Sequence, residues 1–262
     1  MSCMKVRKLI CFGMMNKFGL IGLPLSNPSV LPWRSVEEIA CSPALIVAPH
    51  PDDETLGCGG AIALLRSLNC DVQVLVISDG TLSHPNSQKY PAGKLRALRE
   101  AETLSALKLL GVEVHAVTFL RMQDGSIPTQ YQSAVASCRA YITDMTPQII
   151  FLPWRYDPHA DHRATWKLIH AVLNDLCFYP RLIEYPIWDW DSNQQRSLPE
   201  SLDVTTWRLN INTVVELKQQ AIAAYRSQIT DLIDDDPEGF RLSPEMLANF
   251  THPWEVYLEE IQ

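Results

Sequence analysis

The chain has 262 residues, 47% of them hydrophobic, and a formal net charge of −8 at neutral pH. This length and composition suit one α/β domain with a large core. The acidic balance argues against a nucleic-acid or anionic-membrane partner, because both are anionic and bind a basic face. No run reaches the roughly 18 apolar residues that a membrane span needs, so we expect no membrane-spanning segment.

Seven cysteines are present, an odd number, and no two are spaced as Cys-x-x-Cys. This pattern predicts reduced thiols in a cytoplasmic protein rather than a disulfide framework. The first 25 residues are basic and then apolar, which faintly resembles a signal peptide, but Lys17 interrupts the apolar stretch and no small-residue cleavage site follows. We expect residues 1–40 to form an N-terminal extension and residues 41–262 to form a single domain.

Strand and helix patterns alternate along the chain. Short apolar or β-branched runs predict strands, and longer runs with a 3.6-residue apolar period predict helices. The predicted strands are 44–48, 72–78, 112–120, 148–153, 181–188 and 204–211. The predicted helices are 55–69, 94–110, 130–145, 161–178 and 213–228, with a short one at 244–250. Polar stretches at 81–93 and 231–239 are predicted loops, the second a solvated acidic one.

This alternation predicts a Rossmann-like α/β fold, a mostly parallel sheet with helices on both faces. In the common strand order 3-2-1-4-5, the first and fourth strands are neighbours where the winding of the chain reverses. Ligands bind at this point, outside the carboxyl ends of the strands. We therefore expect the functional site at the C-terminal ends of strands one and four.

The first candidate site segment follows the first strand. Pro49 and Pro51 bracket His50, so the chain leaves the strand there and cannot begin a helix at once. Asp52, Asp53 and Glu54 complete a tight turn. Three acids and an imidazole in one turn repel or perturb one another unless a cation or a ligand absorbs the charge.

The second candidate segment follows the fourth strand and contains His159, Asp161 and His162. The predicted topology brings it to His50 and Asp53 across the switch point. Two imidazoles and a carboxylate suit Zn²⁺ with an open fourth position, and the same set suits Fe²⁺ as a facial triad. Our hypothesis is that His50, Asp53 and His162 bind the metal.

The remaining polar groups then have roles in catalysis. Asp52 lies beside the ligands and is free to take a proton, as a general base does. His159 lies one helical turn before His162 and can donate a proton or a hydrogen bond to developing negative charge. Asp161 can orient a histidine. Glu54 and Asp161 have an alternative interpretation, since either can cap the start of a helix.

Glycines 57, 59 and 60 follow a strand and open a helix, as in a dinucleotide-binding fingerprint, and Asp79 lies where the ribose-binding acid would be. The match fails in detail, because Ile62 stands where the third glycine should be and carboxylates fill the turn. We interpret the glycines as allowing close helix packing. A nucleotide-binding module without catalysis remains an alternative.

Residues 48–60, with Pro158-His-Ala-Asp-His-Arg163, closely resemble the PIG-L/LmbE-like family of zinc-dependent N-acetylglucosaminyl deacetylases. The resemblance covers about residues 42–230. Weaker family features are Arg99 with Glu102, Asp124-Gly125, and Tyr225 to Gln228. The resemblance implies zinc at His50, Asp53 and His162, with Asp52 as the base and His159 at the oxyanion or leaving amine. It also implies that Arg99 and Asp124 hold substrate hydroxyls.

We therefore expect a cytoplasmic hydrolase that removes the N-acetyl group of an N-acetylglucosamine-type amino sugar or its conjugate. Aromatic side chains near the strand exits are candidate sugar contacts: Trp154 first, then Tyr156, Trp188 and Trp190. Two enzymatic alternatives stay open, an amidase that cleaves another amide of a sugar–thiol conjugate and a non-haem Fe²⁺ oxygenase. The sequence leaves the native metal, the sugar and the oligomeric state open.

Overall fold

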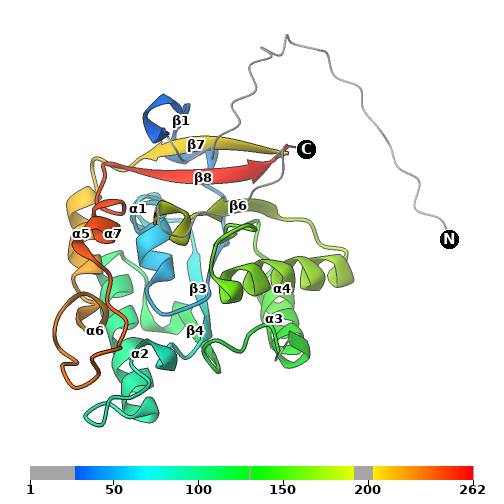
Figure 1. The fold of residues 1–262 in the computed structure, drawn as a ribbon. Helices are drawn as coiled ribbons and strands as arrows, with labels where there is room; N and C mark the ends of the chain where they lie inside the picture. The colour runs from blue at the N-terminus through cyan, green and yellow to red at the C-terminus, as the bar shows by residue number, and fades with distance from the viewer. Residues whose placement is uncertain (1–26, 130, 192–202, 262) are drawn as a thin grey trace, which may run out of the picture.

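The computed structural model describes residues 27–129, 131–191 and 203–261. Within these residues, eight strands form one sheet in the order β1-β7-β8-β6-β5-β2-β3-β4 (Figure 1). The strands are β1 (Trp33–Arg34), β2 (Ala44–Ala48), β3 (Val72–Ser78), β4 (Val117–Met122), β5 (Ile149–Pro153), β6 (Arg181–Tyr185), β7 (Val204–Asn210) and β8 (Trp254–Glu260).

The five strands from β4 to β6 are all parallel, in the order β4-β3-β2-β5-β6. The predicted order of the first five strands is thus confirmed, and β2 and β5 are neighbours at the switch point. β8 lies between β6 and β7 and is antiparallel to both. The sheet is therefore mixed but mostly parallel.

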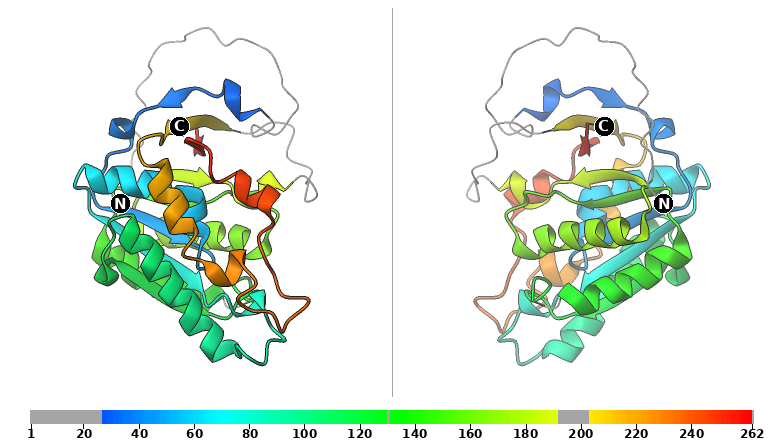
Figure 2. Two further views of the ribbon diagram at one scale, coloured as in Figure 1. Left: turned by 90° about the vertical axis from the view of Figure 1, so that its left-hand side faces the viewer. Right: turned by 90° about the vertical axis from the view of Figure 1, so that its right-hand side faces the viewer.

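Helices cover both faces of the sheet, as Figure 2 shows from its two sides. One hydrophobic cluster joins the sheet to α1 (Asp53–Ser67), α2 (Ala92–Leu109) and α5 (Val215–Ile222). A second cluster joins the opposite face to α3 (Tyr131–Met145) and α4 (Ala160–Leu176). Short helices α6 (Arg226–Ile229) and α7 (Pro244–Ala248) belong to the C-terminal part of the chain.

The apolar run of β2 explains why this strand lies at the centre. All five of its residues are fully buried. Ile46 belongs to the cluster on one face, and Leu45 and Val47 belong to the cluster on the other. A strand that is buried on both faces needs apolar residues at every position, so its sequence shows no alternation.

Several predicted boundaries are wrong. β4 begins at Val117 because residues 114–116 form a 3-10 turn, and the predicted helix 213–228 is two helices, α5 and α6. The strands β1 and β8 were not predicted. β1 is only two residues long and pairs with β7 at the edge of the sheet. The predicted division into an extension and a domain at residue 40 stays a prediction, and residues 1–26 lie outside the described part.

The acidic segment near the C-terminus is a loop, as predicted, and Asp231 and Asp234 are exposed, but the segment is not solvated throughout. Asp236 is only 6% exposed and accepts a hydrogen bond from the backbone amide of Asn86 at 2.8 Å. Asp235 accepts bonds from the amides of Gln88 and Lys89, both at 2.8 Å. These carboxylates therefore fasten the loop between β3 and α2, which carries part of the site described below.

In the described part of the chain, none of the helices combines the length and apolar character needed to cross a bilayer. The five cysteines in this part of the chain are free thiols: Cys41, Cys58, Cys70, Cys138 and Cys177.

Candidate active site

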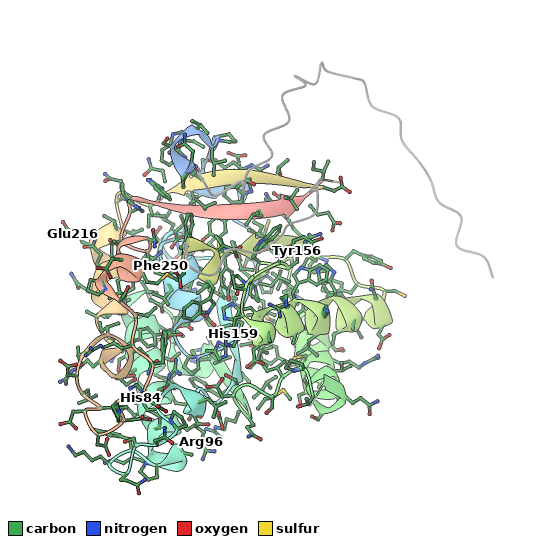
Figure 3. All side chains as sticks on the ribbon, in the orientation of Figure 1. His84, Arg96, Tyr156, His159, Glu216 and Phe250 are labelled. Atoms are coloured by element: carbon green, nitrogen blue, oxygen red, sulfur yellow. The ribbon has the colours of Figure 1, made fainter. Side chains whose placement is uncertain are left out.

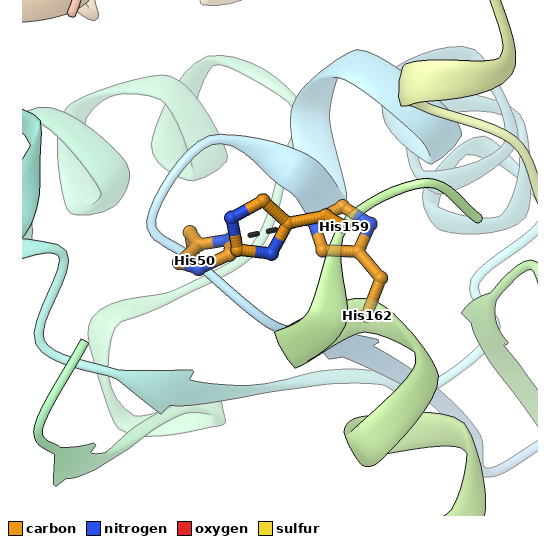
Figure 4. Close-up of side chains that lie close together, drawn as sticks. All are labelled: His50, His159 and His162. Atoms are coloured by element: carbon orange, nitrogen blue, oxygen red, sulfur yellow. Dashed lines mark hydrogen bonds between the residues drawn. The ribbon is translucent and has the colours of Figure 1, made fainter. Parts of the chain in front are cut away.

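A cluster of histidines and carboxylates lies at the carboxyl ends of β2 and β5. His50 lies two residues after the end of β2, and His159 and His162 lie at the start of α4, which follows β5. Because β2 and β5 are adjacent parallel strands, both segments leave the sheet at the same edge. Figure 4 shows the three imidazoles side by side, with a dashed line between His50 and His162.

Three donor atoms of this cluster form a nearly equilateral triangle. Asp53 Oδ2 lies 3.2 Å from His50 Nδ1 and 3.2 Å from His162 Nε2. The two imidazole nitrogens are 3.3 Å apart. Tetrahedral coordination with bonds of about 2.0–2.1 Å places neighbouring donors about 3.3 Å apart, so this spacing fits one tetrahedral ion. A ligand atom of His159 also lies within 4.8 Å of ligand atoms of His50 and His162, so the cluster offers one additional ligand.

Two carboxylates contact the ring nitrogen of His50 that faces away from the triangle. His50 Nε2 lies 3.2 Å from Asp124 Oδ1 and 3.3 Å from Asp161 Oδ2. Asp161 in turn accepts a hydrogen bond from the amide of Gly125 at 2.8 Å. When the proton of His50 is on Nε2, it points to these carboxylates. The lone pair of Nδ1 then points toward the triangle and can bind a metal ion. The predicted orienting role of Asp161 therefore has a geometric basis.

Asp157 is a site residue that the sequence analysis did not single out. Its side chain is fully buried, and its Oδ2 lies 3.2 Å from Nδ1 of His162. Its Oδ1 accepts the backbone amide of His159 at 2.7 Å. Asp157 thus contacts the ring nitrogen of His162 that faces away from the triangle, as Asp161 does for His50. The only signal in the sequence is an acid at the exit of β5, two residues before the histidine motif.

The carboxylates shift the pKa values of the imidazoles. Burial opposes the charged form of His162, yet Asp157 and Asp53 raise its pKa to about 9. Burial likewise opposes the charge on His50, but Asp124, Asp161 and Asp53 raise its pKa well above the ordinary value. Burial acts to raise the pKa of Asp53, and the neighbouring His162 and His50 lower it well below its usual range. The cluster therefore concentrates negative charge where a cation would lie.

Asp52 lies beside the triangle in a strained backbone conformation. Its φ of 127° is unfavourable for any residue with a Cβ atom. Its carboxylate is buried, and its Oδ2 lies 3.1 Å from Nη2 of Arg99. Burial raises the pKa of Asp52 to about 8, although Arg99 acts in the opposite direction.

His159 lies near the centre of the molecule at the edge of the site (Figure 3). Its Nδ1 accepts a hydrogen bond from the amide of Asp161 at 3.2 Å, so a neutral His159 carries its proton on Nε2. Burial lowers the pKa of His159 to about 4. The ring therefore stays neutral near pH 7 and presents an N–H donor.

A cavity of about 290 Å³ opens over this cluster. Its lining includes six of the predicted site residues: His50, Asp52, Asp53, Arg99, Asp124 and His159. Trp188 and Phe240 form an apolar wall together with Leu56, Leu82, Ile187 and Leu242. Trp154 does not belong to the lining, because its side chain is 1% exposed and packs against Tyr156. The geometry thus gives no support to the predicted sugar contact at Trp154.

Arg99 and Asp124 line the cavity but already bond within the protein. Arg99 Nη1 donates to the carbonyl of Gly80 at 2.8 Å, and Nη2 donates to that of Pro51 at 2.5 Å. Asp124 Oδ2 accepts the amide of Leu82 at 2.9 Å. Both side chains therefore hold the turns around the cavity in place.

The weaker family features also meet in space. Glu102, one turn after Arg99 on α2, accepts hydrogen bonds from the amide of Ser227 at 2.8 Å and from its hydroxyl at 2.6 Å. This contact brings Gln228 to the lining of the cavity. Asp79, considered above as a ribose ligand, instead accepts the amide of Asp124 at 3.1 Å and orders that loop.

The glycines of α1 have a packing function, as interpreted from the sequence. A Cβ atom on Gly57 would collide with the ring of Tyr185 on β6. One on Gly60 would lie 2.5 Å from the side chain of Ile211. The helix can therefore lie close against its neighbours only because these positions lack side chains.

The fold and the cluster together define an α/β enzyme with a histidine–aspartate site that can hold a metal ion. Residues 45–173, about half the chain, match the family model described as PIG-L, GlcNAc-PI de-N-acetylase. The chain belongs to the PIG-L family of N-deacetylases, which are hydrolases.

Two curated relatives are similar to this chain. A probable N-acetyl-alpha-D-glucosaminyl L-malate deacetylase 2 of Bacillus subtilis is 26% identical over 79% of this chain and 92% of its own length. A diacetylchitobiose deacetylase of Thermococcus kodakarensis is 33% identical over 54% of this chain and 51% of its own length. Among solved structures, the zinc-inhibited form of the teicoplanin deacetylase Orf2 superposes with a TM-score of 0.61. That protein is 18% identical, over 82% of this chain and 96% of its own, so it supports the fold alone.

Proposed function

We propose that this protein is a zinc-dependent deacetylase that removes the acetyl group from the nitrogen of an N-acetylglucosamine-type sugar or its conjugate. The observation that carries the proposal is the triangle of His50 Nδ1, Asp53 Oδ2 and His162 Nε2, with edges of 3.2–3.3 Å. It lies beside a buried carboxylate and a neutral imidazole at one cavity. The names of the two curated relatives supply the substrate class.

We propose His50, Asp53 and His162 as the metal ligands. Two nitrogens and one oxygen at this spacing suit Zn²⁺ with an open fourth position. Fe²⁺ fits the same donor set, and the metal content of the protein decides between them. When bound, a divalent ion lowers the pKa of a coordinated water to about 7 and polarises the acetyl carbonyl.

Asp52 acts as the general base. Its carboxylate faces the cavity, and burial raises its pKa to about 8 in the metal-free site. A positive charge in the neighbouring triangle favours the ionised carboxylate, because opposite charges lower an acid's pKa. Arg99 holds the Asp52 carboxylate in place at 3.1 Å. The ion therefore favours the form of Asp52 that can accept a proton from the coordinated water.

His159 stabilises the oxygen of the amide as negative charge develops on it. Its Nδ1 is occupied by the amide of Asp161, so Nε2 carries the proton that can be donated. A neutral donor that is already oriented in the cavity stabilises this charge without reorganisation. Arg99 and Asp124, which line the same cavity, are our candidates for contacts with the sugar hydroxyls.

We further propose a cytoplasmic enzyme with a small-molecule substrate. The five free thiols in the described part of the chain are consistent with a reducing compartment.

One experiment tests the proposed reaction. Purified protein is analysed for metal content, and acetate release is measured on N-acetylglucosamine, diacetylchitobiose and the malate and inositol conjugates of N-acetylglucosamine. Chelation is expected to abolish acetate release, and added Zn²⁺ or Fe²⁺ to restore it. Asp52→Asn should retain the metal and lose about 10²- to 10⁴-fold in kcat.

Two results would contradict the proposal. Full acetate release after complete removal of the metal refutes the metal-dependent mechanism. Full activity of Asp52→Asn refutes the base. If sugar–thiol amides are cleaved and acetylated sugars are not, the reaction is the amidase alternative instead.

A further inference from the structure

A second cavity lies next to the one that holds the metal ligands. Its volume is about 480 Å³, against about 290 Å³ for the first. The two share Trp188, Phe240 and Leu242 as a common wall. The second cavity continues over Trp190 and over α7, where Met246 lines it. The two cavities are therefore adjacent, with these three side chains between them.

The common wall is aromatic and connected to the proposed catalytic histidine. The ring of Trp188 stacks near that of His159, with centroids 6.3 Å apart and planes inclined by 25°. Trp188 also meets Phe240 edge to face at 5.5 Å. Trp190 is held in place by a hydrogen bond from its Nε1 to the carbonyl of Pro186 at 3.2 Å. These rings are fixed apolar surfaces, which bind the flat face of another ring at little entropic cost.

The formal charges of the described residues around the second cavity disfavour an acidic ligand. Among the described lining residues, the charged side chains are Asp191, Arg241 and Glu245. Arg241 forms an ion pair with Asp231. The lining thus carries two carboxylates and one guanidinium, and this guanidinium already has a carboxylate partner. A carboxylate of the substrate would meet a surplus of like charge here, whereas a neutral ring of hydroxyl groups would not.

We infer that the second cavity binds a neutral sugar ring attached to the acetylated amino sugar, and that it selects uncharged disaccharides over conjugates of a dicarboxylic acid. This inference rests on the proposed function, because the first cavity must hold the acetylated ring. Trp190 is then a specificity-determining residue. Its indole supports the second ring and has no contact with the reacting amide.

The test compares binding and turnover of diacetylchitobiose with those of N-acetylglucosamine. Binding is measured by calorimetry in the metal-loaded Asp52→Asn background, and acetate release is measured with Asp52 intact. Trp190→Ala is expected to lower the preference for the disaccharide about tenfold in both measurements, as the loss of one aromatic contact does. Trp190→Phe keeps a ring and should retain most of the preference. Trp33→Ala, at an exposed edge of the sheet, is the matched control.

Each result decides the inference. An equal loss for both sugars in Trp190→Ala, or no loss for either, overturns it. Tighter binding of the malate conjugate than of diacetylchitobiose, reversed by Arg241→Ala, overturns it as well. If the disaccharide binds with the expected preference but no substrate releases acetate, the proposed reaction fails while the sugar subsite stands.

Discussion

Glu54 accepts a hydrogen bond from the backbone amide of Asp52 through Oε2, at 3.1 Å. The other oxygen of Glu54 accepts hydrogen bonds from the hydroxyls of Tyr225 and Thr55. Glu54 is fully buried, and Tyr225 is 1% exposed. Glu54, the third acid of the motif, therefore fixes the strained backbone of Asp52. The hydroxyl of Tyr225, a residue distant in the sequence, in turn positions Glu54.

Tyr225→Phe removes one of these supports without opening a cavity. We expect kcat to fall about tenfold, because a small displacement of a base strongly reduces the rate. The Michaelis constant and the metal content should stay unchanged, since neither the ligands nor the cavity wall are altered. Tyr141→Phe is the matched control, because it removes a comparable hydrogen bond, to Gln73 at 3.0 Å. Equal activity of the two variants would show that Tyr225 has only a structural role.

Asp157→Asn tests the carboxylate behind His162. An amide cannot accept the Nδ1–H of His162 as strongly as a carboxylate, so the imidazole becomes a weaker and less oriented ligand. We expect the affinity for Zn²⁺ to fall about 10- to 100-fold, as measured by competition with a chromophoric chelator. Asp175→Asn, on the exposed part of α4, should leave the affinity unchanged. If the affinity of Asp157→Asn for Zn²⁺ is unaltered, Asp157 does not support His162 as a metal ligand.

Metal binding should release protons. In the metal-free protein the pKa of His162 is raised to about 9, and that of His50 lies well above its ordinary value, so both imidazoles are charged at pH 7. A metal ion binds only the neutral imidazole. Its affinity should therefore fall as the pH drops below 9, by about tenfold per pH unit for each proton displaced.

Calorimetry at pH 7 in two buffers of different ionisation enthalpy measures this release. We expect at least two protons per ion, because ionisation of Asp52 adds to the release from the two imidazoles. A heat of binding that is the same in both buffers would contradict the raised pKa values. The same shifts predict that the charged pairs stabilise the metal-free fold below about pH 6.5, and that this stabilisation is lost as the pH rises through 9.

Gly57→Ala tests the close packing of α1. The added methyl group would collide with the ring of Tyr185, whose hydroxyl donates to the carbonyl of Val47 at 2.7 Å. We expect the free energy of unfolding to fall by about 1–3 kcal/mol, the usual cost of overpacking. Gly93→Ala on α2 meets no atom within 4 Å and should be neutral or stabilising by about 0.4–1 kcal/mol. Equal stability of the two variants, measured by denaturant unfolding, would refute the packing explanation.

Local patterns were sufficient for the central strands. The apolar runs of β2 and β3 match their observed bounds, because strands buried on both faces need continuous apolar residues. The same patterns failed at the periphery. β8 was missed although it lies between β6 and β7. Three of its seven residues are glutamates. Glu255 is buried and is bound by Lys218 at 2.7 Å and by the amides of Gly60 and Ala61, all from other parts of the chain.

By itself, the sequence determined which residue types stand at the ends of β2 and β5, and with the family resemblance it indicated the chemistry. It could do so because His50, Asp53 and His162 lie in two short motifs whose topology follows from strand–helix alternation. Only the tertiary structure decided which carboxylate supports each imidazole, that Glu54 and Tyr225 hold Asp52, and that Trp188 rather than Trp154 faces the cavity. These relationships join residues from separate elements, and the direction of a buried side chain depends on neighbours that are distant in the sequence.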